Sequence, residues 1–222
     1  MMTRTALERQ LAEIQADMLV LAGMVESAIE RGIEALRNRD AQLAREIIAD
    51  DIKINRKRYE TEEKCLELIA TQQPLAGDLR TIVAVLFIIV DLERMGDHAE
   101  GIAKIALMLA DEPPLKPYID IPRMAQIASR MLMGSIEAFK HRDADRARAI
   151  CNEDDEVDGL YDQVYRELLT FMLQDPRTIQ RATYLTWVAH NLERIADRAT
   201  NICERVVYLV EGKIEELNVS KY

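Results

Sequence analysis

Apolar residues recur every three or four positions along almost the whole chain of 222 residues, which is the spacing of one face of an α-helix. This pattern predicts a first helix of about thirty residues that ends near Asn38. A second helix follows, with Asp40 as its N-terminal cap, and continues to about Ile69. After a break, Asp78 is expected to cap a third helix that reaches about Leu109.

The helical pattern stops at residues 113–122, where four prolines fall within ten residues. Proline lacks a main-chain N–H and cannot continue a helix through its interior. We therefore expect a proline-rich linker at 113–122 between a first unit, residues 1–112, and a second unit, residues 123–222.

The second unit repeats the first. It predicts a helix that ends near His141, a second helix from about 143 to 173, and a last helix that reaches about Leu217. The sequence EALRNRDA at residues 34–41 returns as EAFKHRDA at residues 137–144. Long helices joined by short turns favour antiparallel bundles. The predicted fold is all-α, a tandem repeat of two antiparallel three-helix bundles.

The last helix of each unit carries an acidic motif. DLERMGDHAE at residues 91–100 returns as NLERIADRAT at residues 191–200. Each motif places a glutamate and an aspartate four residues apart on one helix face, where like charges repel by roughly 0.2–0.5 kcal/mol. The acids beside the apolar stripe are Glu93, Asp97 and Glu100 in the first unit, and Glu193, Asp197 and Glu204 in the second.

The second helix of each unit carries a matching polar pair, Asp51 with Asn55 and Asp154 with Asp158. In an antiparallel hairpin, residues equally far from the turn lie at the same height. This places each polar pair level with the Glu–Asp pair of the following helix. A group of oxygen ligands with this much negative charge predicts a hard cation such as Fe(III), Mn(II) or Mg(II), with Zn(II) as an alternative.

An ordinary charged surface is the competing interpretation. Acidic residues four positions apart are common on solvated helices, and Arg94, Arg194, Arg198 and Lys104 are close enough to neutralise several of these acids. The histidines form no ligand set, and the Glu-x-x-His signature of ferritin-like di-iron bundles is absent from the sequence.

Composition narrows the class of protein. The net charge of −10 disfavours nucleic acid and anionic membrane surfaces as partners. Cys65, Cys151 and Cys203 show neither a disulfide framework nor zinc-ligand spacing, which suits reduced thiols in the cytosol. The N-terminus lacks the apolar region of a signal peptide. The most apolar run, residues 82–90, is too short for a transmembrane segment.

The chain resembles the PhoU family of cytoplasmic regulators of phosphate signalling over essentially its whole length. The residues that carry the resemblance are LERMGDHAEGIAK at 92–104, LERIADRATNICE at 192–204 and QQPLAGDLR at 72–80, together with the internal repeat. The resemblance implies two three-helix bundles and a homodimer.

The resemblance also implies clusters of iron or zinc held through E(D)xxxD motifs, with iron as the first expectation. These motifs correspond to Glu93 with Asp97 and to Glu193 with Asp197. Their expected partners are the pair Asp51 and Asn55 and the pair Asp154 and Asp158. Because Asn55 replaces a carboxylate, the first site is expected to bind fewer or weaker ions.

In function, the resemblance implies a non-enzymatic negative regulator that links the ATPase of the phosphate ABC transporter to the phosphate-sensing histidine kinase. The sequence contains no GxxxxGK[ST] loop, GxSxG elbow or kinase signature. Two alternatives stay open, namely a carboxylate-bridged metalloenzyme on a helical bundle and a metal-free structural spacer.

Overall fold

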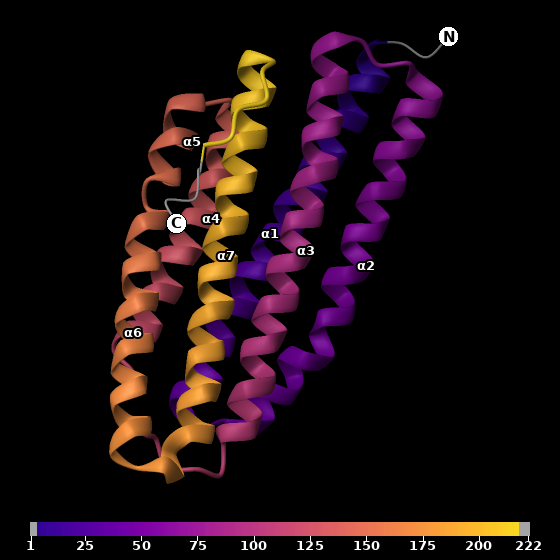
Figure 1. The fold of residues 1–222 in the computed structure, drawn as a ribbon. Helices are drawn as coiled ribbons and strands as arrows, with labels where there is room; N and C mark the ends of the chain where they lie inside the picture. The colour runs from indigo at the N-terminus through magenta and orange to yellow at the C-terminus, as the bar shows by residue number, and fades with distance from the viewer. Residues whose placement is uncertain (1–3, 218–222) are drawn as a thin grey trace.

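The structure, a computed structural model, describes residues 4–217, and these residues form helices without any strand. Figure 1 shows two groups of long helices lying side by side. The first group contains α1 (Arg4–Asn38), α2 (Ala41–Gln72) and α3 (Ala76–Leu109). The second contains α4 (Asp120–His141), α5 (Ala144–Cys151), α6 (Asp154–Gln174), the short 3₁₀ helix η1 (Pro176–Thr178) and α7 (Ile179–Glu211). The predicted all-α fold of two repeated helical bundles is confirmed.

Helix α3 lies at the centre of the molecule, against α1, α2 and α7 (Figure 1). This position explains most of its apolar run, because Ile82, Val85 and Ile88 are fully buried, whereas Phe87 is 47% exposed. Helix α7 has the same place in the second group, where it packs against α4, α5 and α6. No helix of the described residues is long and apolar enough to cross a membrane.

Helices α3 and α7 run antiparallel, and two polar contacts connect them. Arg198 Nη1 donates to Asp91 Oδ1 at 3.2 Å, as does Asn201 Nδ2. Farther along the interface, His98 Nδ1 and Asn191 Oδ1 lie 2.9 Å apart. Asp91 and Asn191 are 100 residues apart, as are His98 and Arg198. The two contacts therefore occupy equivalent places in the two repeats, related by an approximate two-fold axis.

The predicted helix starts are correct in one case and wrong in another. Asp40 caps α2, because its side chain accepts hydrogen bonds from two main-chain N–H groups of the first turn. Asp78 does not cap α3. This helix begins two residues earlier, at Ala76, and Leu75 before it provides no side-chain cap. Asp78 lies instead in the first turn, where a negative charge interacts favourably with the helix dipole.

The predicted helix over residues 143–173 is interrupted. Helix α5 ends at Cys151 and α6 begins at Asp154, since the chain turns at Asn152 and Glu153. Short polar side chains compete with helical hydrogen bonds, which favours a turn here. Helix α4 begins at Asp120, so Pro122 lies in its first turn, where the missing N–H is tolerated. The domain division at 113–122 stays a prediction.

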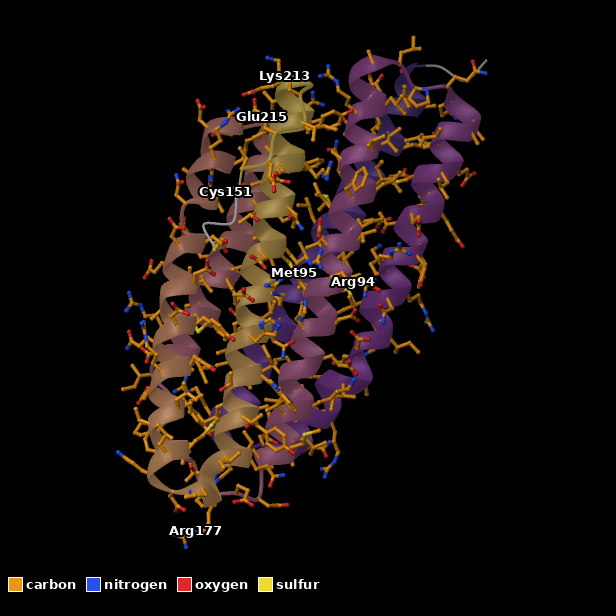
Figure 2. All side chains as sticks on the ribbon, in the orientation of Figure 1. Arg94, Met95, Cys151, Arg177, Lys213 and Glu215 are labelled. Atoms are coloured by element: carbon orange, nitrogen blue, oxygen red, sulfur yellow. The ribbon has the colours of Figure 1, made fainter. Side chains whose placement is uncertain are left out.

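The last helix ends at Glu211 and not near Leu217 as predicted. Gly212 has a φ of +73°, a left-handed conformation that reverses the chain after α7. Figure 2 shows Lys213 and Glu215 close to this end of α7. The reversed segment returns along the helix, and the main-chain N–H of Leu217 donates to Glu204 Oε1 at 2.9 Å. The apolar periodicity continues beyond Gly212, so the pattern alone did not indicate that the helix ends before this glycine.

Gly96 permits a close approach between α2 and α3. A Cβ atom at Gly96 would lie 3.0 Å from Ile54 Cγ2, at the limit of van der Waals contact. At Gly23, by contrast, an added Cβ would meet no other atom within 4 Å. The spacing of the two helices that carry the first acidic cluster therefore depends on Gly96.

Replacing Gly96 with leucine is expected to lower the free energy of unfolding by about 1–3 kcal/mol, because the added side chain overpacks the contact with Ile54. Gly23→Ala is the matched control and should raise stability by up to about 1 kcal/mol through helix propensity alone. Urea unfolding followed by circular dichroism measures both. Equal stability of Gly96→Leu and wild type would show that this contact does not set the helix spacing.

Candidate metal centres

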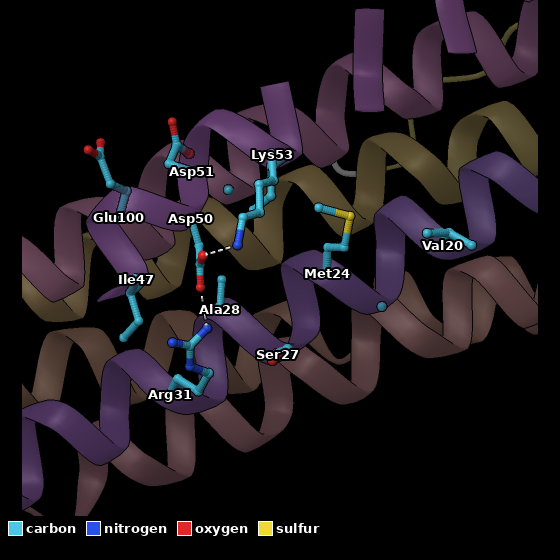
Figure 3. Close-up of a pocket in the computed structure, with 13 residues that line it drawn as sticks. Val20, Met24, Ser27, Ala28, Arg31, Ile47, Asp50, Asp51, Lys53 and Glu100 are labelled. Carbon is cyan, nitrogen blue, oxygen red and sulfur yellow. Dashed lines mark hydrogen bonds and ion pairs between the residues drawn. The ribbon is translucent and has the colours of Figure 1, made fainter. Parts of the chain in front are cut away.

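The first cluster lies between α2 and α3. Asn55 Nδ2 donates to Asp51 Oδ2 at 2.7 Å, whereas Asp51 Oδ1 is buried and has no hydrogen-bond partner within residues 4–217. Burial raises the pKa of Asp51, and the charges of Glu100 and Asp97 raise it further. Figure 3 shows Asp51 and Glu100 directed toward the same side of the helices. The structure thus brings α2 and α3 acids together, as the level positions predict.

Glu93 belongs to the same group. Burial raises its pKa first, and the charge of Asp97 on the same helix adds to the effect. The two acids therefore repel each other in a partly desolvated place, where repulsion is stronger than in water.

The second cluster lies between α6 and α7. Burial raises the pKa of Asp158 to about 6, and the charges of Glu193 and Asp197 contribute next. Burial also raises the pKa of Asp197, again with a contribution from Glu193. Asp154, at the start of α6, is only 2% exposed. Three of the predicted residues thus interact directly across the two helices.

Arginine side chains partly neutralise both clusters, as the competing interpretation anticipates. Arg94 Nη1 lies 3.4 Å from Asp97 Oδ2, and its equivalent Arg194 lies 2.8 Å from Glu193 Oε2 and 3.1 Å from Asp197 Oδ2. Arg94 is labelled in Figure 2. A cation at either cluster would have to compete with these guanidinium groups for the carboxylate oxygens.

Glu100 and Glu204 are not equivalent residues. Lys104 Nζ lies 2.6 Å from Glu100 Oε2, and the residue 100 positions after Lys104 is Glu204. Glu204 lies two turns beyond Asp197, about 10 Å along the axis of α7. It accepts a hydrogen bond from the returning C-terminal segment, and it lines a cavity of about 400 Å³ with Asp197 and Glu216. Glu204 is thus at the edge of the second cluster.

One histidine, His190, lies beside the second cluster, a contact that the sequence analysis did not anticipate. His98 contacts Asn191 in the α3–α7 interface and belongs to neither cluster. His190 was not among the predicted residues, yet its Nδ1 lies 3.3 Å from Glu193 Oε2. The i,i+3 spacing of His190 and Glu193 could have indicated this contact from the sequence.

The family resemblance implies a bound metal, and the acidic side chains provide some of the features that such a metal needs. Within residues 4–217, no group of three or more His, Cys, Asp or Glu side chains is oriented to hold a metal ion. The donor set nevertheless fits a hard cation, because it is almost entirely carboxylate oxygen and one buried oxygen of Asp51 lacks a partner. The residue types therefore fit a hard cation, whereas their side-chain orientations among the described residues do not yet form a site, and binding would require the Arg94 and Arg194 ion pairs to open.

Comparisons with known proteins agree with this architecture. A family model described as the PhoU domain matches residues 18–106 and 121–206. The phosphate-specific transport system accessory protein PhoU homolog of Aquifex aeolicus is 44% identical over 206 residues, which cover 93% of each chain. The corresponding homolog from Clostridium acetobutylicum is 39% identical and covers 98% of this chain and 100% of its own.

Solved structures agree as well. The crystal structure of PhoU from Pseudomonas aeruginosa matches with a TM-score of 0.89 and 34% identity, over 93% of this chain and 99% of that chain. The PhoU structure from Streptococcus pneumoniae matches with a TM-score of 0.88 and 31% identity, over 95% and 99%. Fold and clusters define an all-helical protein of two repeats with an acidic group in each. The chain belongs to the PhoU family.

Replacing Asp158 with asparagine is expected to raise the stability of the metal-free protein near neutral pH. The pKa of Asp158 is about 6 in the folded protein, against an ordinary value of 3.8, so the folded state binds this proton more tightly. Stability therefore falls as the pH rises from about 4 to about 6 and stays lower above that range. Asp158→Asn has no carboxyl group at this position, so its stability does not fall over this pH range for that reason.

Urea titrations in chelator between about pH 4 and pH 8 measure the effect. The stabilisation by Asp158→Asn should be largest near neutral pH and disappear near pH 4. Asp111→Asn, at an exposed position outside both clusters, is the control and should change nothing. A pH-independent effect of Asp158→Asn would contradict the burial of its charge.

Proposed function

We propose that the protein is a non-enzymatic cytoplasmic adaptor that regulates phosphate uptake and signalling. The observation that carries the proposal is its match, over almost its full length, to relatives named accessory proteins of the phosphate-specific transport system. A helical protein without a catalytic motif can regulate by binding one conformation of a partner better than another.

The proposed partners are the ATPase of the phosphate ABC transporter and the phosphate-sensing histidine kinase. When phosphate is plentiful, the protein would connect the two and hold the phosphate response off, which makes it a negative regulator. The net charge of −10 supports protein partners over nucleic acid.

We further propose that each cluster binds metal through carboxylates, with iron first and zinc, manganese or magnesium as alternatives. Asp51, Glu93, Asp97 and Glu100 would hold it in the first unit, and Asp154, Asp158, Glu193 and Asp197 in the second. Glu204 lies at the edge of the second group, and Asn55 supplies a neutral oxygen to the first. Bound metal would join α2 to α3 and α6 to α7, replacing mutual repulsion with attraction.

Two other functions are distinguishable by experiment. A carboxylate-bridged metalloenzyme would show turnover that disappears in Asp197→Ala, whereas the adaptor should show no appreciable ATPase, phosphatase or oxidase activity. A metal-free helical spacer would bind no metal at all. The buried Oδ1 of Asp51, which has no hydrogen-bond partner within residues 4–217, supports metal binding over the spacer.

Metal binding is expected to raise the free energy of unfolding of the wild type by RT ln(1 + [L]/Kd), or about 2.7 kcal/mol at a hundredfold excess over Kd, and to raise its melting temperature accordingly. Glu93→Gln/Asp97→Asn should lose one part of this increase, and Glu193→Gln/Asp197→Asn a larger part, because the second cluster has Asp158 where the first has the neutral Asn55. Thermal melts with and without chelator, together with elemental analysis, measure the effect. Unchanged melts and no bound metal in all three proteins would contradict the sites.

Partner binding is tested separately with purified proteins. The chain should retain the transporter ATPase, the sensor kinase or both in a pull-down, and should not bind DNA at physiological salt. DNA binding without retention of either protein would overturn the adaptor. Repeating the pull-down with the two metal-cluster double variants then shows whether bound metal is needed for partner binding.

A further inference from the structure

A pocket of about 410 Å³ opens between α1 and α2, next to the first acidic cluster (Figure 3). Most of its lining is apolar, with Met24 and Ala28 contributed by α1 and Ile47 and Ile54 by α2. Ala28, Ile47 and Ile54 are buried, so the inner part of the pocket is shielded from water. Pockets of this volume commonly bind small organic molecules.

In the second unit, ion pairs span the equivalent place. The repeat offset of 103 puts Arg130 of α4 at the position of Ser27 in α1. Arg130 Nε donates to Glu153 Oε2 at 2.8 Å. Arg123, two turns earlier on α4, donates from Nη2 to Glu156 Oε1 at 2.7 Å. These long side chains connect α4 to the beginning of α6, so the repeat can be built with this place bridged.

The first unit has short side chains where the second has long ones. Gly23 takes the position of Gln126, and a Cβ added at Gly23 would meet no other atom within 4 Å. The ion pairs here gather at Asp50, whose Oδ2 lies 2.9 Å from Arg31 Nη1 and whose Oδ1 lies 2.6 Å from Lys53 Nζ (Figure 3). They leave the space beside Gly23 open. The fold does not require this space, which indicates a ligand.

One polar atom of the pocket lacks a partner. Asp51 lines the pocket, and its Oδ1 is buried without a hydrogen bond to any residue from 4 to 217. Glu100 lines the same pocket, and Figure 3 shows both carboxylates on the side of Asp50 opposite Arg31. A buried acceptor without a donor is costly, and a charged donor forms the stronger hydrogen bond with a carboxylate. This end of the pocket therefore favours a cationic donor over an anion.

We propose that this pocket binds a small primary amine with an apolar body. The ammonium group donates one proton to Asp51 Oδ1 and a second to Glu100, while the apolar body lies against Met24 and Ile54. The apolar walls favour such a compound over a hydrated inorganic cation, because the body leaves water on binding. Asp51 also belongs to the first acidic cluster, so an amine and a metal ion would compete for it.

Phenylbutylamine is the probe, and isothermal titration calorimetry of the protein in chelator measures its Kd. It should bind more tightly than phenylbutanol and phenylbutyrate, which carry a neutral and an anionic head on a closely similar body. Asp51→Asn should raise the Kd of the amine by about tenfold or more, because a charge-assisted hydrogen bond is lost, and should change that of the alcohol little. Since chelator removes metal, the result does not depend on metal binding by the clusters.

Gly23→Leu tests the location, because the new side chain would fill the pocket. It should abolish binding of the amine. Gly159→Leu is the matched control, since Gly159 lies on α6 outside the pocket and a Cβ added there also meets no other atom within 4 Å. It should leave the Kd unchanged. Both variants should melt at or above the wild-type temperature, because leucine has the higher helix propensity.

Three results would overturn the proposal. The first is a wild type that does not bind phenylbutylamine. The second is equal affinity for the amine, the alcohol and the acid. The third is a folded Gly23→Leu variant that binds the amine as the wild type does.

Discussion

The packing of α3 against α7 is the contact on which the rest of the structure depends. Each helix packs against the other long helices of its own group, and the two together join the repeats in antiparallel order. Asp91, 8% exposed, lies in this interface, where an unpaired charge would be costly. Its hydrogen bonds with Arg198 and Asn201 fix the relative height of the helices. With that relative height fixed, the acids of the first cluster on α3 face α2. The acids of the second cluster on α7 face α6.

The acidic clusters oppose the stability of the fold that holds them. Apolar packing on one side draws α2 toward α3 and α6 toward α7, and the same approach desolvates carboxylates of like charge. The raised pKa values of Asp51 and Asp158 are the sign of this conflict. Unfavourable local arrangements, such as like charges close together, are common at functional sites. The packing of the surrounding structure holds such groups in place, although the groups themselves repel one another. Arg94 and Arg194 reduce the repulsion without removing it.

Periodicity and the internal repeat were sufficient to predict the all-α fold and the approach of Asp51 to Asp97, because both follow from helix geometry and position relative to a turn. The interruption before Asp154 and the reversal at Gly212 were missed, since each depends on one or two residues within an unbroken apolar pattern. The sequence also could not show which acids the arginines contact. Long side chains choose among several rotamers, and tertiary surroundings decide between them.

The non-identical ends of the α3–α7 interface bear on how such a repeat can evolve. Two separate, identical single-repeat chains would have to place the same residue pair at both ends of their shared interface. Here one end holds the ion pair of Asp91 and Arg198, and the other holds Asn191 with His98. Covalent duplication frees each position to change independently. A substitution can then change the residue pair at one end of the interface and leave the other end unchanged. In a symmetric assembly of identical chains, the same substitution would change both ends.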